Sequence, residues 1–160
     1  MSQSNNDYAI VVAPILASWV VTYFTGGVDE YKYRPAWFQP PGWVFGVAWT
    51  ALYIMFGFLL MESKRQEDWT TLVLVCFILF FTYLWQYLFN YRKFYKLALY
   101  DLLVILTLAF VLFGHLTDAP IVDNSNFGES YIMVYAPFVV WIIFAIILST
   151  HTAYPKIRTI

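Results

Sequence analysis

Five long apolar stretches, separated by short polar segments, organise the chain from one end to the other. They cover approximately residues 8–25, 43–61, 70–90, 97–114 and 131–149. Each stretch is close to the ~20 residues that an α-helix needs to cross the hydrocarbon core of a bilayer. The pattern predicts an all-α integral membrane protein, in which a five-transmembrane-helix bundle forms a single membrane domain over residues 1–160.

The polar segments between these stretches are too short to form a second domain, and no internal repeat or Gly/Ser-rich linker divides the chain. The first seven residues, MSQSNND, contain no Lys or Arg. The first stretch therefore lacks the positive region of a cleaved signal peptide, and we expect it to remain as the first helix.

The basic residues of the connecting segments predict an orientation in the membrane. One side receives two of them, Lys64 and Arg65, from the second connection. The other side receives seven, from the first and third connections and the C-terminal tail: Lys32, Arg34, Arg92, Lys93, Lys96, Lys156 and Arg158. Because cytoplasmic loops carry the excess of Lys and Arg, the C-terminus is predicted to be cytoplasmic.

Composition agrees with lipid as the solvent and argues against several classes of function. Hydrophobic residues make up 61% of the chain and charged residues 12%, whereas soluble proteins have ~45–50% and ~25%. A net charge of −1 gives no basic field for a nucleic acid. The single cysteine and two histidines form no metal-ligand cluster. We expect no nucleic-acid partner, no metal and no covalent cofactor.

The segment 34–53, which opens the second helix, is dense in aromatic residues. The proline pair at 40–41 suits the first turn of a helix, where no N–H donor is lost. Gly42 and Gly46 form a small-xxx-small pattern, which predicts a close helix contact. Trp49 lies deeper in the helix, so its indole either packs in the bundle or lines a cavity. Periodicity alone favours packing for Trp49.

Two later helices carry stripes that mix indole, hydroxyl and small or kinking residues. The third helix contributes Ile78, Thr82, Trp85 and Phe89, and the fifth contributes Pro137, Trp141, Ala145 and Leu148, with Ser149 alongside. Such stripes suit the lining of an apolar pocket with a few polar groups. They equally suit an ordinary helix interface with hydroxyls bonding across it, and periodicity leaves both readings open.

Asp101 is the only acidic residue inside a predicted span, where a charge costs at least ~2.5–3.5 kcal/mol on insertion scales. It must therefore face protein or water. We expect a structural role at the start of the fourth helix, as a cap or as a tether to a basic group such as Arg92, Lys93 or Arg34. The alternatives are a solvated carboxylate at the membrane interface and a ligand or proton site. No second carboxylate or histidine lies within a predicted span, so a paired-carboxylate site or a proton relay lacks its parts.

The residues named above resemble the translocator protein or tryptophan-rich sensory protein family (TspO/MBR), also called the peripheral-type benzodiazepine receptors. The family signature is matched by Arg34, Pro35, Trp37, Pro40, Pro41, Trp43, Val44, Phe45, Gly46, Trp49, Thr50, Leu52, Tyr53 and Gly57. Two further blocks keep the family's spacing: Trp85, Phe89, Ala98, Leu99 and Asp101, then Pro137, Trp141, Ala145 and Leu148. The chain departs from the family at Thr82 and Ser149, where asparagine is usual, at Phe56 in place of Met, and at Phe138 in place of Tyr.

The resemblance implies a pocket under the first loop that binds porphyrins (tetrapyrroles), sterols such as cholesterol, or benzodiazepine-type ligands. Its ligand-binding residues would be Trp49, Thr82, Trp85, Trp141, Ala145 and Ser149. Leu148, Tyr154 and Lys156 lie near the family's sterol motif and fit the pattern proposed for cholesterol contact, although Tyr154 and Lys156 also suit interfacial anchoring. The resemblance further implies a bacterial or mitochondrial outer membrane, and often a homodimer.

Three functions follow from these observations. The first is a membrane protein that binds, and in some members transports, hydrophobic ligands. The second is an enzyme that degrades porphyrins in light, with Trp49 and Trp141 taking part in electron transfer. The third is a structural membrane protein whose aromatic residues only pack.

Overall fold

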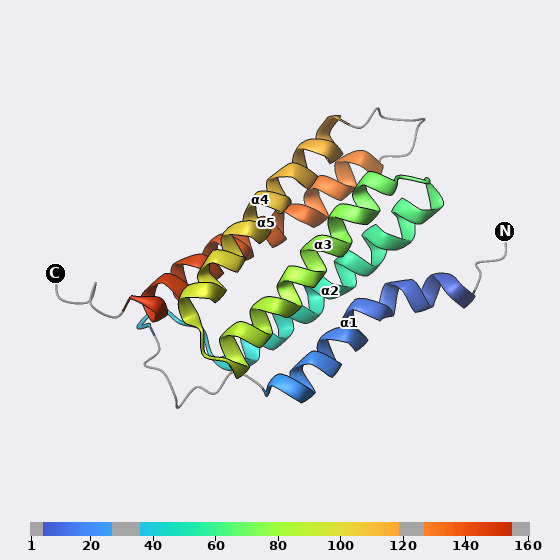
Figure 1. Ribbon diagram of the computed structural model, residues 1–160. Helices are drawn as coiled ribbons and strands as arrows, with labels where there is room; N and C mark the ends of the chain where they lie inside the picture. Colours follow the sequence, from blue (N-terminus) through green and yellow to red (C-terminus); the bar gives the residue numbers. More distant parts are fainter. Residues whose placement is uncertain (1–4, 27–35, 119–126, 155–160) are drawn as a thin grey trace.

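The computed structural model describes residues 5–26, 36–118 and 127–154, and these ranges contain five long helices (Figure 1). The helices are α1 (Asn5–Thr25), α2 (Gly42–Arg65), α3 (Trp69–Gln86), α4 (Tyr95–Asp118) and α5 (Phe127–Ala153), with a π-helical turn, η1 (Tyr87–Tyr91), that continues α3. All five are long and apolar enough to cross a membrane. The predicted five-helix membrane bundle is therefore confirmed.

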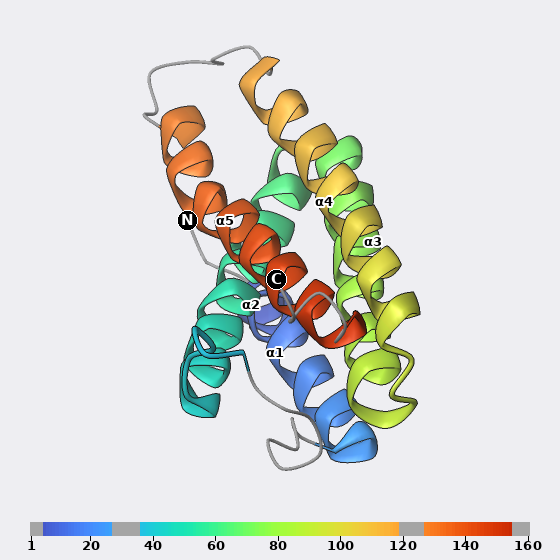
Figure 2. The same ribbon diagram turned by 90° about the vertical axis from the view of Figure 1, so that its left-hand side faces the viewer.

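The helices run in alternating directions, and each packs along its neighbours for most of its length (Figures 1 and 2). α4 packs against α3 and α5, while α1 lies along α2. At one end of the bundle, α1, α3 and α5 finish and α2 and α4 begin; we call it the C-terminal end. The short segment 36–41 crosses this end, beside the last turns of α5.

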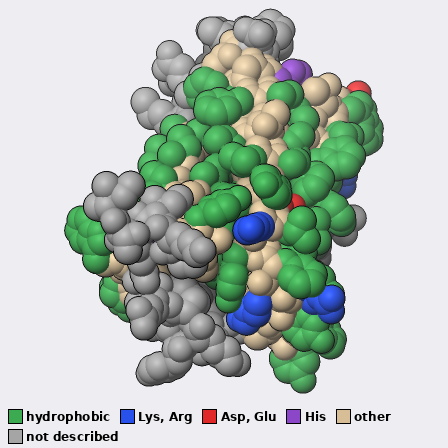
Figure 3. Space-filling model, turned by 60° about the vertical axis from the view of Figure 1, so that its left-hand side comes forward, with side chains coloured by type: hydrophobic (Ala, Val, Ile, Leu, Met, Phe, Trp, Pro, Cys, Tyr) green, Lys and Arg blue, Asp and Glu red, His purple; other side chains and the backbone are tan. Residues whose placement is uncertain are grey.

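Large apolar side chains lie on the outside of the bundle as well as in its core. Trp19, Phe80 and Val140 are 65%, 59% and 67% exposed. Figure 3 shows hydrophobic side chains over the sides of the bundle, with Lys and Arg at only a few positions. A surface of this kind would be unfavourable in water and is satisfied by lipid tails, so the chain is an integral membrane protein.

A close backbone contact joins α1 to α2 at Gly57. A Cβ atom at this position would overlap the backbone carbonyl of Val11 on α1. The prediction of a close contact at Gly46 is wrong within this chain, because a Cβ there would meet nothing within 4 Å. A second contact holds α1 against α3, where the Tyr83 hydroxyl donates to the Pro14 carbonyl oxygen at 2.8 Å.

Polar side chains connect neighbouring helices at the end of the bundle opposite to the C-terminal end. Asp7 of α1 pairs with Arg65 of α2 at 2.9 Å. Asp68 caps α3 by accepting from the Thr71 backbone N–H at 3.1 Å. The two carboxylate oxygens of Asp68 also each lie 3.3 Å from Nε2 of His115 on α4.

Asp101 does not make the predicted tether to the basic residues of the third connection. Its side chain is buried, and its Oδ2 has no hydrogen-bond partner. No ion pair joins it to Arg92 or Lys93 in the described part of the chain, and Arg34 lies outside the described residues. Arg92 instead places its guanidinium 5.0 Å from the centre of the Phe94 ring. Asp101 sits more than a turn inside α4, too deep to cap its start at Tyr95.

Candidate ligand pocket

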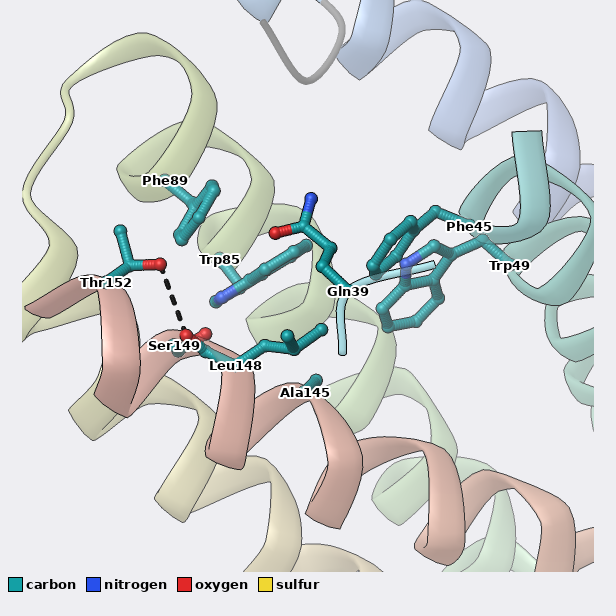
Figure 4. A pocket seen from close by; sticks show the side chains of 9 residues that line it. All are labelled: Gln39, Phe45, Trp49, Trp85, Phe89, Ala145, Leu148, Ser149 and Thr152. Atoms are coloured by element: carbon teal, nitrogen blue, oxygen red, sulfur yellow. Dashed lines mark hydrogen bonds between the residues drawn. The ribbon is translucent and has the colours of Figure 1, made fainter. Parts of the chain in front are cut away.

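A pocket lies at the C-terminal end of the bundle, between segment 36–41, α2, the end of α3, η1 and α5 (Figure 4). Its described lining is mainly aromatic and aliphatic and includes no charged side chain. The lining residues are Gln39, Phe45, Trp49, Trp85, Phe89, Ala145, Leu148, Ser149 and Thr152. Such a lining suits an apolar ligand that is oriented by a small number of polar groups.

The start of α2 positions segment 36–41 over this pocket. Pro41 is extended, with φ −54° and ψ 148°, and its carbonyl accepts the first helical hydrogen bond, from Val44 N at 2.9 Å. Gln39 closes a turn by donating its N–H to the Ala36 carbonyl at 2.9 Å. The ring of Phe38 lies edge-on to His151 of α5, 6.0 Å away. The segment thus covers the pocket and reaches across to α5.

Trp49 is the centre of a group of aromatic rings beside the pocket. Its ring centre lies 6.0 Å from that of Trp85 and 6.4 Å from that of Trp141, so α2 meets both α3 and α5 through indoles. Tyr53, one turn further along α2, stacks on Trp49 at 5.7 Å. Aromatic pairs in these geometries are worth ~0.5–1.5 kcal/mol each beyond the area they bury. The aromatic wall of the pocket is therefore rigidly supported.

The π-helical turn η1 follows Trp85 directly and carries Phe89 into the lining. The rings of Trp85 and Phe89 stack at 5.2 Å with an interplanar angle of 27°. A π-helical turn changes the angular position of the residues that follow it, and such turns are frequent at functional sites. Here it sets the end of α3 against the mouth of the pocket.

The polar groups of the pocket lie toward the last turns of α5. The Thr152 hydroxyl donates to the Leu148 carbonyl at 3.2 Å, and Ser149 is almost fully buried beside it. Figure 4 shows the indole nitrogen of Trp85 directed toward Ser149 and Thr152. This nitrogen is buried and has no hydrogen-bond partner.

The free space in the pocket is small, with a cavity volume of about 30 Å³. This is room for about two water molecules, whereas pockets that hold drug-sized ligands measure ~300–1,000 Å³. A tetrapyrrole or sterol therefore requires the lining to move apart. Gln39 is the lining residue that lies outside the helices, so segment 36–41 can move with the least loss of helix packing.

The structure brings together four of the six predicted ligand-binding residues: Trp49, Trp85, Ala145 and Ser149. Thr82 is fully buried outside the lining and donates its hydroxyl to the Ile78 carbonyl at 2.7 Å. Trp141 lies behind the lining, where its ring contacts those of Trp49 and Phe45.

The residues of the predicted sterol motif are spread along and beyond the end of α5. Leu148 lines the pocket. Tyr154 lies just after α5, with Lys96 Nζ 5.4 Å from its ring centre. Lys156 lies outside the described residues.

Four lining residues were missing from the predicted site: Gln39, Phe45, Phe89 and Thr152. Three of them carried a periodic signal. Phe45 precedes Trp49 by four residues, Phe89 follows Trp85 by four, and Thr152 follows Leu148 by four. Gln39 carried no such signal, because it lies in a connection.

Comparison with known proteins adds one match. A model of the TspO/MBR family matches residues 10–154, a range that contains the whole described lining of the pocket. No curated protein matches the chain.

Proposed function

The chain belongs to the TspO/MBR family, and on that basis we propose that its pocket binds flat apolar ligands, either tetrapyrroles (porphyrins) or sterols. The observation that carries the proposal is the composition of the pocket lining. Aromatic rings from α2, α3 and η1 face an aliphatic wall on α5, and the polar groups are few and uncharged. An apolar macrocycle gains from stacking and burial in such a site.

The absence of charge in the described lining restricts which part of a ligand can enter. A carboxylate would lose its hydration there without gaining an ion pair, so a tetrapyrrole should keep its acidic groups toward the mouth. Basic residues of the third connection lie at the same end of the bundle, and Lys96 lies against the Tyr154 ring beside the end of α5. These basic residues would attract the carboxylates of a tetrapyrrole at the mouth of the pocket.

Entry of a ligand requires segment 36–41 to lift away from α5. The ring of Phe38 contacts that of His151 edge-on, and the segment has no regular secondary structure to disrupt. From the excess of basic residues we propose that this mouth faces the cytoplasm. Binding and release of the ligand would then occur at the cytoplasmic face.

A second candidate function, light-dependent degradation of a bound porphyrin, is favoured by the contacts among three indoles. Trp49 contacts both Trp85 and Trp141. A porphyrin against Trp49 could take an electron from that indole when it is excited by light, and neighbouring indoles could share the resulting radical cation. In this role Trp141 would act behind the lining, through Trp49.

The test is a titration of the purified protein with protoporphyrin and, separately, with cholesterol, in darkness and then under illumination. Saturable binding of either ligand without its loss in light supports the binding function. Light-dependent loss of protein-bound porphyrin, faster than in detergent alone, supports the photochemical function. Absence of saturable binding for both ligands contradicts both proposals and leaves the aromatic residues with a packing role.

A further inference from the structure

We infer that the pocket selects ligands that carry an uncharged hydrogen-bond acceptor, such as a carbonyl oxygen, and that the indole N–H of Trp85 is the group that binds it. The inference rests on the proposed function of the pocket and narrows its ligand class. It starts from the one polar atom of the lining that is both buried and without a hydrogen-bond partner among the described residues.

The Trp85 side chain is 7% exposed, so water does not compensate its N–H group effectively. An indole nitrogen can only donate a hydrogen bond. A buried donor that remains unpaired loses its hydrogen bonds to water, and no hydrogen bond within the protein compensates this cost in free energy. Figure 4 shows this nitrogen directed toward the polar end of the pocket, where Ser149 and Thr152 lie. A ligand oxygen placed there would satisfy it.

The direction of this N–H group is set before any ligand arrives. The Trp85 ring is stacked on Phe89 at 5.2 Å and lies 6.0 Å from the ring of Trp49 at an interplanar angle of 31°. Rotation of the indole would break both contacts. A donor held in this way loses little conformational freedom on binding, which favours ligands whose acceptor matches its position.

Two hydroxyl donors near the pocket are occupied, and a second indole donor lies outside its lining. The hydroxyls of Thr82 and Thr152 already donate to carbonyl oxygens of their own helices, at 2.7 and 3.2 Å. The Trp141 nitrogen is also unpartnered, but Trp141 is not part of the lining. The Trp85 N–H group is therefore the buried, unpartnered donor of the described lining, and it distinguishes an acceptor-bearing ligand from a purely hydrocarbon one.

The experiment compares three porphyrins of similar shape, in darkness, with the full-length protein in detergent. Protoporphyrin IX has carboxylates, its dimethyl ester keeps uncharged carbonyl acceptors, and etioporphyrin has alkyl groups only. Affinities are measured by the shift of porphyrin absorbance for the wild type, Trp85→Phe and the control Trp69→Phe. Trp69 begins the same helix at the opposite end of the bundle and is 66% exposed.

The wild type and Trp69→Phe should bind the dimethyl ester about tenfold more tightly than etioporphyrin, the factor expected for one net hydrogen bond. In Trp85→Phe this ratio should fall to about one. An unchanged ratio in Trp85→Phe overturns the inference and leaves the proposed function standing. Failure of the wild type to bind any of the three porphyrins saturably contradicts the tetrapyrrole part of the proposed function, and the inference falls with it. The ratio of the affinities for protoporphyrin IX and for its dimethyl ester reports separately on how charge at the mouth of the pocket affects binding.

A readout on the wild type keeps the inference testable even if Trp85→Phe does not fold. Protein labelled with ¹⁵N-tryptophan, with Trp85 assigned, should show a larger downfield shift of the Trp85 indole proton with the dimethyl ester than with etioporphyrin. Both ligands have closely similar ring currents, so the difference between the two shifts reports mainly on the hydrogen bond. Equal shifts with both ligands would overturn the inference.

Discussion

At the scale of single residues, the difference between the short hydroxyl side chains of Ser and Thr and the indole of Trp explains why two buried indole donors remain free in this bundle. A hydroxyl can reach the carbonyl of the preceding turn, and in a membrane this is the nearest available acceptor. Several do so: Thr50, Ser63, Thr82, Thr107, Thr150 and Thr152 donate to the carbonyl oxygen four residues earlier. An indole N–H lies too far from its own backbone to do the same. Trp85 and Trp141 consequently keep buried, unpartnered donors.

We predict that Gly57→Ala lowers stability. The added methyl group would overlap the Val11 carbonyl, so α1 must move away from α2 or the backbone must shift. Overpacking of this kind costs ~1–3 kcal/mol. The expected result is a lower midpoint of thermal unfolding in detergent, together with easier proteolytic removal of α1.

The matched control is Gly46→Ala in the same helix. A Cβ at Gly46 meets nothing within 4 Å, and alanine favours the helix over glycine by ~0.5–1 kcal/mol. Its midpoint should equal or exceed that of the wild type. A loss at Gly46 as large as the loss at Gly57 would show that the α1–α2 contact is not the cause.

Much of the candidate site follows from the sequence at this scale, and the remainder depends on how helices meet. Trp85, Ala145 and Ser149 could be predicted because mixed stripes and the family resemblance point to the same positions, whereas Trp49 followed from the resemblance alone. Periodicity gives the face of a helix but not the height at which a neighbour crosses it. For this reason Trp141 falls just behind the lining, and Gln39 enters it through the packing of Phe38 on His151.

At the scale of helices, Asp68 connects the start of α3 to the end of α4. Partial burial raises the pKa of Asp68, but hydrogen bonds from Thr71 and from His115 outweigh this effect and hold the pKa below its usual value. A lowered pKa in the folded state means that the ionised carboxylate stabilises the fold. This stabilisation is complete above the pKa of the unfolded chain, ~3.9, and is lost as the pH falls through the lowered folded value.

We therefore predict that Asp68→Asn is less stable than the wild type at pH 7, and that this difference closes below about pH 4. Unfolding midpoints measured in detergent across this range provide the test. Because the pair is partly exposed, solvent screens it, and the difference should be modest. Thr71→Val removes the hydroxyl that donates to Asp68, so the stability that this variant loses on acidification should be smaller than in the wild type. A difference that is constant with pH would contradict the assignment.

The helices themselves were the most predictable elements. Five apolar stretches of bilayer length leave little choice of structure, because only helices or closed barrels satisfy the backbone in lipid. The π-helical turn η1 could not be predicted, since the extra residue in a turn has no compositional signature and depends on the packing around it. The side-chain contacts at the helix ends could not be predicted either. Arg92, for example, contacts the Phe94 ring and not the predicted partner Asp101.

At the scale of the whole molecule, the pocket lies at the end of the bundle where the described basic residues Arg92, Lys93 and Lys96 are found. We predict that this end, with the C-terminus, faces the cytoplasm, from seven Lys and Arg against two on the other side. In sealed vesicles of known orientation, a C-terminal tag should be cleaved only by protease on the cytoplasmic side. A tag cleaved only from the opposite side would invert the topology and the proposed route of ligand exchange.

The most direct measurement of the central claim, that a flat ligand binds among the aromatic rings between α2, α3 and α5, is the dark affinity of Trp49→Phe for protoporphyrin. Trp49 lines the pocket and contacts the rings of Trp85, Trp141 and Tyr53. Phenylalanine preserves much of the bulk and removes the larger stacking surface, so affinity should fall about tenfold, as for the loss of ~1.4 kcal/mol. Trp69→Phe, far from the pocket, should bind as the wild type does. Equal affinities in all three proteins would contradict the account and leave Trp49 as a packing residue.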